Sequence, residues 1–269
     1  MRLLAKRMAL VEHRPSLWLR TYGRWPNGGN VLSHILIPWV RAFEAWAAVH
    51  DEYADRLADS GGDYGWWGGE RAQIGFLNAA FWRAGGCAME EYHCMKKRNS
   101  NRPSAVKRYK GRADFFVDVG PSSFAVEAKL AQRRIVDLAA QRRLGARYDL
   151  KKHVNKAHLS AGRALQDAVD AVNNTEECSD YRAAVAFVIP WVRTTQTAAN
   201  RRPAALRAAK VAVRTYLNHG QFIGRRVLRA DYLPTMRSSK MMKRTWQTEP
   251  GNDAHAWFCP GVTAVVQFV

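Results

Sequence analysis

The sequence predicts a mixed α/β (α+β) fold, in which helices pack against a β-sheet. Three observations point to this class. Apolar residues recur at helical spacing in the N-terminal part and again beyond residue 200. Short apolar runs near the centre and at the C-terminus, bounded by turn residues, are typical of strands. The 269 residues are 47% hydrophobic, which is enough to fill the core of one large domain.

The N-terminal quarter is predicted to be helical after an irregular start. Residues 13–30 are rich in Pro, Gly, Arg and Trp, a composition typical of irregular chain. Asn30 is a suitable N-cap for a long helix that runs towards Asp59, where a glycine-dense loop stops it. We therefore expect residues 1–65 to form an N-terminal helical extension and residues 66–269 to form the main domain.

The main domain is predicted to begin with a helix from Glu70 to the glycine pair at 85–86. Three strands are expected next, and the turn between the last two is assigned to residues 120–123. The region that follows is expected to be helical, with breaks near residues 145–149 and near Asn155. The elements expected after the glycine pair are strands at 87–95, 113–119 and 124–129, an exposed loop at 96–112, helix at 132–172, a strand at 181–190 that ends at Pro190, a helix at 202–219, a basic stretch at 224–244 and a last strand at 261–269.

Basic residues dominate the charge of the chain. Lys and Arg number 42 against 23 Asp and Glu, which gives a formal net charge of +19. An excess of this size repels itself unless an anionic partner neutralises it, so we expect a nucleic acid as the partner. Residues 96–112 hold eight basic residues and no acidic one. The side chains expected to contact phosphates are Lys96, Lys97, Arg98, Arg102, Lys107, Arg108, Lys110, Arg112, Arg133 and Arg134.

Composition also disfavours several classes of protein. No apolar run approaches the roughly 18 residues that cross a bilayer, and the N-terminus lacks the apolar segment of a secretion signal. The four cysteines, Cys87, Cys94, Cys178 and Cys259, form no C-x-x-C pair that would favour a zinc site or a disulfide framework. We expect them to be buried thiols of a cytoplasmic protein without a membrane partner.

The two central strands place acidic residues and a lysine on one face of the sheet. Pairing the strands across a four-residue turn puts Phe116 opposite Glu127 and Asp114 opposite Lys129. Because side chains alternate between faces, Asp114, Asp118, Glu127 and Lys129 share one face, and apolar side chains fill the other. In this register Asp118 lies diagonal to Glu127, so Asp114 and Asp118 compete as its partner.

Such a group of charges has a defined chemistry. Clustered carboxylates repel one another unless a cation lies between them, and oxygen ligands favour Mg²⁺ or Mn²⁺ over zinc. With a lysine near the ion, the parts provide metal-assisted hydrolysis of a phosphodiester. The alternative is an ordinary solvated sheet face whose Asp, Glu and Lys form ion pairs.

The pattern R-A-D at 112–114 followed by E-A-K at 127–129 resembles the PD-(D/E)XK nuclease superfamily, which has the restriction-endonuclease-like fold. Ala113 replaces the proline of the nominal motif. The predicted order helix, strand, strand, strand, helix, strand over residues 70–189 is also similar to that superfamily. The resemblance implies a restriction-endonuclease-like mixed β-sheet core flanked by helices, and a Mg²⁺-dependent deoxyribonuclease of the endonuclease type.

The resemblance also implies roles for individual residues. Asp114 and Glu127 would hold Mg²⁺ or Mn²⁺, with Asp118 as a further ligand, and Lys129 would assist the attacking water. Glu70 would face the ion from the first helix, although a carboxylate there also suits the helix dipole.

A polar residue on the helix after the E-A-K strand would touch the site. Gln166 is the best match, with Gln132 and Gln141 as competitors, and a solvated helix residue is the alternative reading. Glu90 or Glu91 on the preceding strand would offer one more carboxylate, because alternation sends one of them to each face.

Two other functions compete with a DNA nuclease. The first is a non-catalytic, basic nucleic-acid-binding protein that keeps the fold, and the second is an RNA-directed nuclease. Carboxylates that face a polyanion favour catalysis, since binding alone does not need them. Cutting both strands of a duplex usually takes two active sites, so a homodimer is a further expected partner state.

Overall fold

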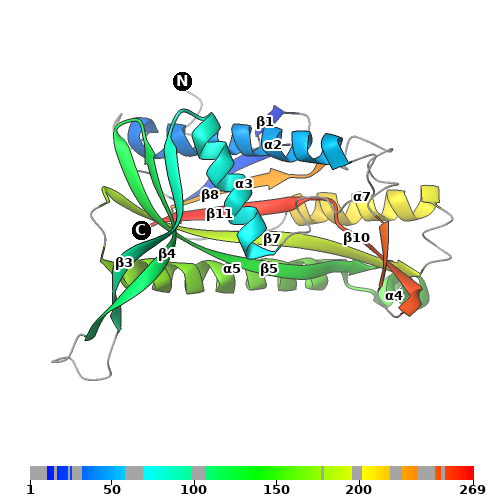
Figure 1. Cartoon of the computed structure of the whole chain (residues 1–269). Helices are drawn as coiled ribbons and strands as arrows, with labels where there is room; N and C mark the ends of the chain where they lie inside the picture. Colours follow the sequence, from blue (N-terminus) through cyan, green and yellow to red (C-terminus); the bar gives the residue numbers. More distant parts are fainter. Residues whose placement is uncertain are drawn as a thin grey trace.

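One mixed β-sheet runs through the molecule, and helices cover both of its faces (Figure 1). The computed structural model describes residues 11–14, 17–23, 25, 32–57, 69–98, 107–176, 179–195, 202–218, 226–234, 246–249 and 252–269. The strands are β1 (Val11–Arg14), β2 (Leu17–Tyr22), β3 (Cys87–Arg98), β4 (Lys107–Val119), β5 (Ser122–Asp137), β6 (Thr175–Glu176), β7 (Tyr181–Thr195), β8 (Val227–Tyr232), β9 (Trp246–Glu249), β10 (Asn252–Phe258) and β11 (Val262–Phe268). A mixed α/β architecture is therefore present, as predicted.

The sheet has eleven strands in the order β1-β2-β8-β11-β7-β5-β4-β3-β6, and β10 pairs with β7 and with β9. Strands β5 and β7 are parallel, and the other pairs in the described part of the chain are antiparallel. The parallel pair requires a crossover, which helices α4 and α5 supply.

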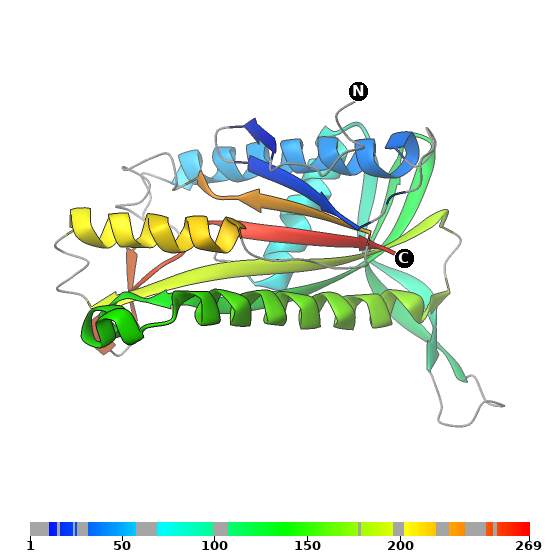
Figure 2. The same cartoon turned by 180° about the vertical axis from the view of Figure 1, so that it is seen from behind.

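The helices divide between the two faces of the sheet (Figure 2). They are a π-helical turn (Leu32–Leu36) leading into α2 (Ile37–Leu57), α3 (Glu70–Arg83), α4 (Leu138–Leu144) with a 3₁₀ turn (Gly145–Arg147), α5 (Leu150–Asn173) and α7 (Arg202–Asn218). Helices α2 and α3 cover one face, and α4, α5 and α7 cover the other. In the described residues, no helix combines the length and the apolar character that crossing a bilayer requires.

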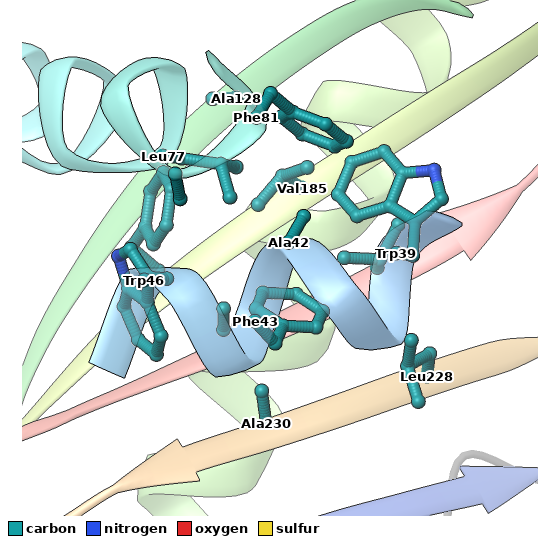
Figure 3. Close-up of a cluster of buried hydrophobic side chains, with 14 of the residues drawn as sticks. Trp39, Ala42, Phe43, Trp46, Leu77, Phe81, Ala128, Val185, Leu228 and Ala230 are labelled. Atoms are coloured by element: carbon teal, nitrogen blue, oxygen red, sulfur yellow. The ribbon is translucent and has the colours of Figure 1, made fainter. Parts of the chain in front are cut away.

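Aromatic side chains of α2 fill the core on the first face (Figure 3). Trp39, Phe43 and Trp46 are fully buried, and the Trp39 ring meets Phe81 and Phe124 edge to face at centroid distances of 5.0 and 5.9 Å. Rings at these distances and angles add to the burial of apolar area. Helix α2 is therefore part of the main core.

The expectation of an irregular segment at 13–30 and a helical extension over 1–65 was only partly right. Strand β2 pairs along its whole length with β8, and β1 pairs with β2. Leu17 and Leu19 point into the core, as alternate residues of a half-buried strand do. This alternation was not recognised because Arg and Trp residues lie between and around the two leucines. Asn30, the expected N-cap, and Asp59 lie outside the described residues.

Three further expectations needed correction in length. Strand β5 continues to Asp137, so residues 132–137 are strand, and α5 passes Asn155 without a break. Strand β7 does not end at Pro190 but continues to Thr195. Pro190 falls between the last pair with β11, at Val188, and the first pair with β10, at Val192, where a residue without a backbone N–H disturbs neither ladder.

The basic stretch 224–244 contains a strand that sequence reasoning missed. All six residues of β8 are buried, including Arg229, whose guanidinium pairs with Asp231 at 2.8 Å and lies over the Tyr216 ring. Asp231 also accepts a hydrogen bond from the Thr263 hydroxyl at 2.5 Å. The ion pair with Asp231 offsets the cost of burying the charge of Arg229, so this basic residue can occupy a core strand.

Strands β4 and β5 form the predicted antiparallel hairpin, but in a different register. The turn is the pair Gly120–Pro121, with Gly120 at φ +61°, and Val119 pairs with Ser122. Ser122 and Ser123, read as turn residues, belong to β5, and the Ser123 amide and hydroxyl both donate to Asp180 at 2.8 Å. The shift is two residues, so each side chain keeps its predicted face.

Candidate active site

The sheet forks at Asp114. Strands β4 and β5 pair from the turn as far as Phe115 and Val126, and beyond that point β4 stays with β3 while β5 stays with β7. Continuing the register by one residue sets Asp114 level with Glu127, rather than with Lys129 as expected. Past the fork, β3 and β4 leave the body of the sheet as a twisted hairpin (Figure 1).

Carboxylates occupy the edge of β5 that the fork opens. The Ala128 amide donates to Asp114 Oδ2 at 2.6 Å, and the Leu130 amide donates to Glu70 Oε2 at 2.9 Å. These N–H groups have lost the strand partner that β4 supplies closer to the turn. Helix α3 begins at Glu70, so the first residue of that helix reaches the fork from the other face of the sheet.

Lys129 joins these two carboxylates. Its ammonium group donates to the Ala128 carbonyl at 2.7 Å and lies 3.5 Å from Glu70 Oε1 and 3.9 Å from Asp114 Oδ2. The side chains of Lys129 and Glu70 are each 36% exposed, and that of Asp114 is 25% exposed. The structure thus brings three of the predicted residues together at a position that is partly exposed to solvent.

Glu127 lies beneath this group and is almost completely buried. Its residue exposure is 3%, and Oε1 accepts from Lys96 Nζ at 2.6 Å and from the Thr175 hydroxyl at 3.4 Å. Burial raises the pKa of the Glu127 carboxyl above its ordinary value, the bond from Lys96 lowers it, and the nearby charge of Asp114 raises it again. The two carboxylates of the motif therefore interact electrostatically across the fork.

Lys96 lies on a strand, not in the exposed loop where the sequence placed it. It was expected to contact phosphate from an exposed loop, but it is a strand residue whose side chain is only 14% exposed. The stem of Lys96 lies over Gly111 on the neighbouring strand, where an added Cβ would stand 3.0 Å from its Cγ and Cδ. A glycine inside a strand often marks such a close approach, and this was the available signal.

Asp118 and Gln166 do not join the group. In the observed register Asp118 pairs with Ser123, four residues along the strand from the level of Glu127, or about 13 Å at 3.3 Å per residue. The diagonal contact between Asp118 and Glu127 was therefore wrong. Gln166 lies on α5, and its amide donates to Asp170 one turn later at 2.8 Å.

Both glutamates of β3 reach towards α3, contrary to the expected alternation. Glu90 accepts from the Asn78 amide at 3.1 Å, and Glu91 pairs with Arg71 at 2.7 Å. Glu91 has φ +48°, a left-handed conformation that interrupts alternation, and it lies between the β3–β4 pairs made by Glu90 and Tyr92. This irregularity stands opposite Asp114, where the hairpin begins to twist away.

The described residues of the segment 96–112 are strand rather than loop. Residues 92–98 of β3 and 107–113 of β4 form an antiparallel ribbon, called the arm below, with Lys96 opposite Tyr109 and Lys97 opposite Arg108. Backbone pairing holds the ribbon together although many of its side chains are basic. Arg102 lies outside the described residues.

The arm keeps an excess of positive charge despite its ion pairs. Lys97 and Arg108 share the single carboxylate of Glu176, and Arg112 shares Glu91 with Arg71. The side chains of Lys97, Arg108 and Arg112 are 44, 66 and 62% exposed. Lys110 lines a surface pocket of about 490 Å³ together with His93, Cys94, Met95 and Glu176. Each shared carboxylate leaves one basic group in excess, which suits contact with phosphates.

The remaining predicted contacts lie on the other side of the fork. Arg133 and Arg134 are exposed on β5, about 20 Å beyond Glu127 at 3.3 Å per residue, and they bond Ser160 and Asp137. Cys87 is exposed, contrary to expectation, whereas Cys94 and Cys259 are buried, and all three are free thiols. Cys178 lies outside the described residues.

The donors at the fork are suited to a hard divalent cation. Within the described ranges, no three Asp, Glu, His or Cys side chains gather into a complete ligand set. Mg²⁺ commonly uses one or two carboxylates and completes its shell with water and substrate phosphate oxygens. Asp114 and Glu127 meet that requirement in number and in chemistry, but an ion at Glu127 competes with the ammonium group of Lys96.

Comparison with known proteins adds no relative: no family model, no curated protein and no solved structure matches this chain.

Proposed function

We propose that this protein is a divalent-metal-dependent deoxyribonuclease with a restriction-endonuclease-like core. The observation that carries the proposal is the meeting of Glu70, Asp114 and Lys129 at the sheet fork, within electrostatic range of the buried Glu127. These residues come from three separate elements, and two of the carboxylates bond backbone amides of the strand that carries Lys129. Ordinary surface ion pairs need no such convergence.

The element order supports the same proposal. Helix α3, the meander β3-β4-β5, the helices α4 and α5, and the parallel strand β7 follow one another in the order that the E-A-K motif led us to expect. The arm projects from the body of the sheet at the fork (Figure 2). A nucleic acid held along the arm by its excess of basic side chains would lie next to Lys129.

The side chains at the fork have distinct roles in this proposal. Asp114 and Glu127 would hold a divalent ion, which lowers the pKa of a bound water and offsets charge on the phosphate. Lys129, whose side chain is 36% exposed, would exchange its present partners for the attacking water or a phosphate oxygen. Glu70, 3.5 Å from the Lys129 ammonium, would hold that group at the fork.

The proposal is tested by a cleavage assay on single-stranded, double-stranded and branched DNA and on RNA. Each substrate is incubated with Mg²⁺, with Mn²⁺ or with EDTA, alongside a Glu127→Ala preparation purified in the same way. We expect cleavage of DNA that needs the metal and is lost in the variant. Cleavage that persists in EDTA or in Glu127→Ala would contradict the proposal, and cleavage of RNA alone would make the protein a ribonuclease.

One observation favours a second candidate, a non-catalytic nucleic-acid-binding protein. Glu127 already has a cation, Lys96, at 2.6 Å, so its charge is compensated without a metal. In that case the arm binds nucleic acid while the fork is a structural ion-pair group. Tight binding of duplex DNA without cleavage in any metal is the result that would establish this second function.

A further inference from the structure

Lys96 differs from every other basic side chain described on the arm. Its neighbours Lys97 and Arg108 pair with Glu176 at the surface, with side chains 44 and 66% exposed. Lys96 turns towards the body of the sheet, where its side chain is 14% exposed and its ammonium group lies 2.6 Å from a carboxylate that is itself 4% exposed. A buried ammonium group is a poor ligand for the phosphates of a nucleic acid.

The position of Lys96 is fixed from several sides. Gly111 leaves room for its stem, because any larger residue would press against Cγ and Cδ. Thr175 of β6 pairs with Lys96 in the sheet, and its hydroxyl bonds the same Glu127 oxygen at 3.4 Å. The next amide along, that of Lys97, donates to the Asn174 carbonyl at 2.7 Å. Strands β3, β4 and β6 thus hold one ammonium group against one carboxylate.

We infer that Lys96 is a positioning residue of the metal site, a resident cation at Glu127 that a divalent ion must displace or share in order to bind. The inference rests on the proposed function, because it assumes that Glu127 is a metal ligand. The reason is electrostatic: Asp114 and Glu127 repel each other across the fork, and the ammonium group of Lys96, 2.6 Å from Glu127, offsets that repulsion together with Lys129, 3.9 Å from Asp114. Without Lys96 the same carboxylates attract an external cation more strongly.

The experiment measures Mn²⁺ binding to the whole protein in the absence of nucleic acid, from the electron paramagnetic resonance signal of the free ion. Lys96→Met removes the charge and keeps the stem, whereas Lys96→Arg keeps a cation at this position. Lys97→Met is the matched control, because it makes the same change in net charge on the adjacent residue, whose partner is Glu176. Glu127→Gln identifies the site that is being measured.

We expect Lys96→Met to bind Mn²⁺ about tenfold more tightly than the wild type, since the buried ion pair with Glu127 no longer competes. Lys96→Arg should stay close to the wild type, Lys97→Met should leave the affinity unchanged, and Glu127→Gln should bind weakly. If Lys96→Met does not fold, Gly111→Ala decides instead: it keeps both charges but displaces the Lys96 stem, and should also tighten binding, by a smaller factor.

Unchanged or weaker binding in Lys96→Met, or an equal gain in Lys97→Met, would overturn the inference. In the first case Lys96 is a structural partner of Glu127, and in the second the effect is one of net charge. These outcomes differ from failure of the proposed function, in which the wild type neither cleaves DNA nor loses Mn²⁺ affinity in Glu127→Gln.

Discussion

Asp114, Glu127 and Lys129 each have a proposed role in cleavage at the fork, so substitution of any of them should reduce the activity. We expect Asp114→Asn and Glu127→Ala each to slow DNA cleavage by about 10³-fold or more, because the ion loses a ligand and stabilisation of transition-state charge falls by several kcal/mol. Lys129→Ala should also remove most of the activity. The measurement is single-turnover cleavage at saturating Mg²⁺, with duplex binding measured in parallel.

Asp118→Asn is the internal control for that series. Asp118 lies on the same face but four residues from the level of Glu127, so its loss should be much milder than that of Asp114. Duplex binding should survive in all four variants, since the exposed basic side chains of the arm are unchanged. A loss in Asp118→Asn that equals the loss in Asp114→Asn would show that the metal ligands are assigned to the wrong part of β4.

A buried histidine makes stability depend on pH. His50 is fully buried on α2, stacked between the rings of Phe76 and Tyr232 at 4.2 and 5.0 Å, and burial lowers its pKa from 6.5 to about 3. Because the folded protein keeps His50 neutral, the unfolded chain binds one more proton than the folded protein between pH 6.5 and pH 3. The titration of His50 therefore leaves the free energy of unfolding at its full value above pH 6.5 and lowers it as the pH falls from 6.5 towards 3. Between pH 7.5 and 4.5 the loss amounts to about 3 kcal/mol.

His50→Phe tests this dependence because it keeps a ring and removes the titration. Urea unfolding at pH 7.5 and at pH 4.5 should show a smaller loss of unfolding free energy for the variant than for the wild type. The difference between the two losses isolates His50 from the carboxylates that also titrate in this range. Equal losses in the two proteins would mean that His50 is not the group responsible.

At the residue scale, sequence reasoning identified the faces of β4 and β5 correctly, but it did not predict the burial of their side chains or the irregularity at Glu91. Period-two alternation placed Asp114, Glu127 and Lys129 on one face, and a register shift of two residues does not change that. Alternation contains no information about what covers a face. The burial of Glu127 depends on Thr175 and Lys96, which come from β6 and β3, and only the three-dimensional fold brings these elements to it.

At the scale of single elements, the substitution Gly→Ala can be compared in a turn, where the backbone has a positive φ, and in a helix, where it does not. Gly120 has φ +61° in the β4–β5 turn, so Gly120→Ala should destabilise the protein by about 1 kcal/mol. Gly162 lies within α5 with nothing within 4 Å of an added Cβ, so Gly162→Ala should stabilise it by about 0.5–1 kcal/mol. Urea midpoints at constant m-value measure both effects, and a shift of the same sign in both variants would contradict the assigned conformations.

Element type was easier to predict than element length. Helix α3, the strands β3, β4, β5 and β7, helix α7 and strand β11 were all expected at their positions, because each has a clear period or a clear end signal. The predicted strand β5 was too short because Gln132–Arg134 are polar and exposed. Strand β8 was not predicted because its arginine, Arg229, has a buried acidic partner that a local pattern does not reveal. Such compensation by residues distant in sequence is invisible to a local pattern.

At the scale of the whole molecule, the excess of basic residues predicts binding that depends on salt. If about five Lys or Arg side chains neutralise phosphates, the logarithm of duplex affinity should fall with the logarithm of salt concentration at a slope near −4.5. Fluorescence anisotropy of a labelled duplex from low to high salt measures the slope. An affinity nearly independent of salt would rule out phosphate contact as the main source of binding.

The architecture as a whole was predicted as a class but not in its extent. A mixed sheet with helices on it follows from the order of periodic segments, and the order over residues 70–189 was correct except for the short strand β6, which was not expected. The N-terminal strand β2 pairs with β8, about 200 positions away in the sequence. A pattern of neighbouring residues does not specify a strand partner at that distance. The fork arises because β4 stays paired with β3 and β5 stays paired with β7 after the two strands separate, and a local pattern does not specify where that separation occurs.

That fork also bears on self-association. A strand edge stripped of its neighbour is a template on which a strand from another molecule can add, and aggregation begins in this way. The Asp114 and Glu70 carboxylates occupy the Ala128 and Leu130 amides along that edge, and their charge repels an incoming backbone carbonyl. We therefore expect Asp114→Ala with Glu70→Ala to scatter more light on mild heating than Asp114→Asn with Glu70→Gln, which keeps both acceptors. The carboxylates proposed to take part in cleavage would then also prevent the protein from aggregating through the open edge of β5.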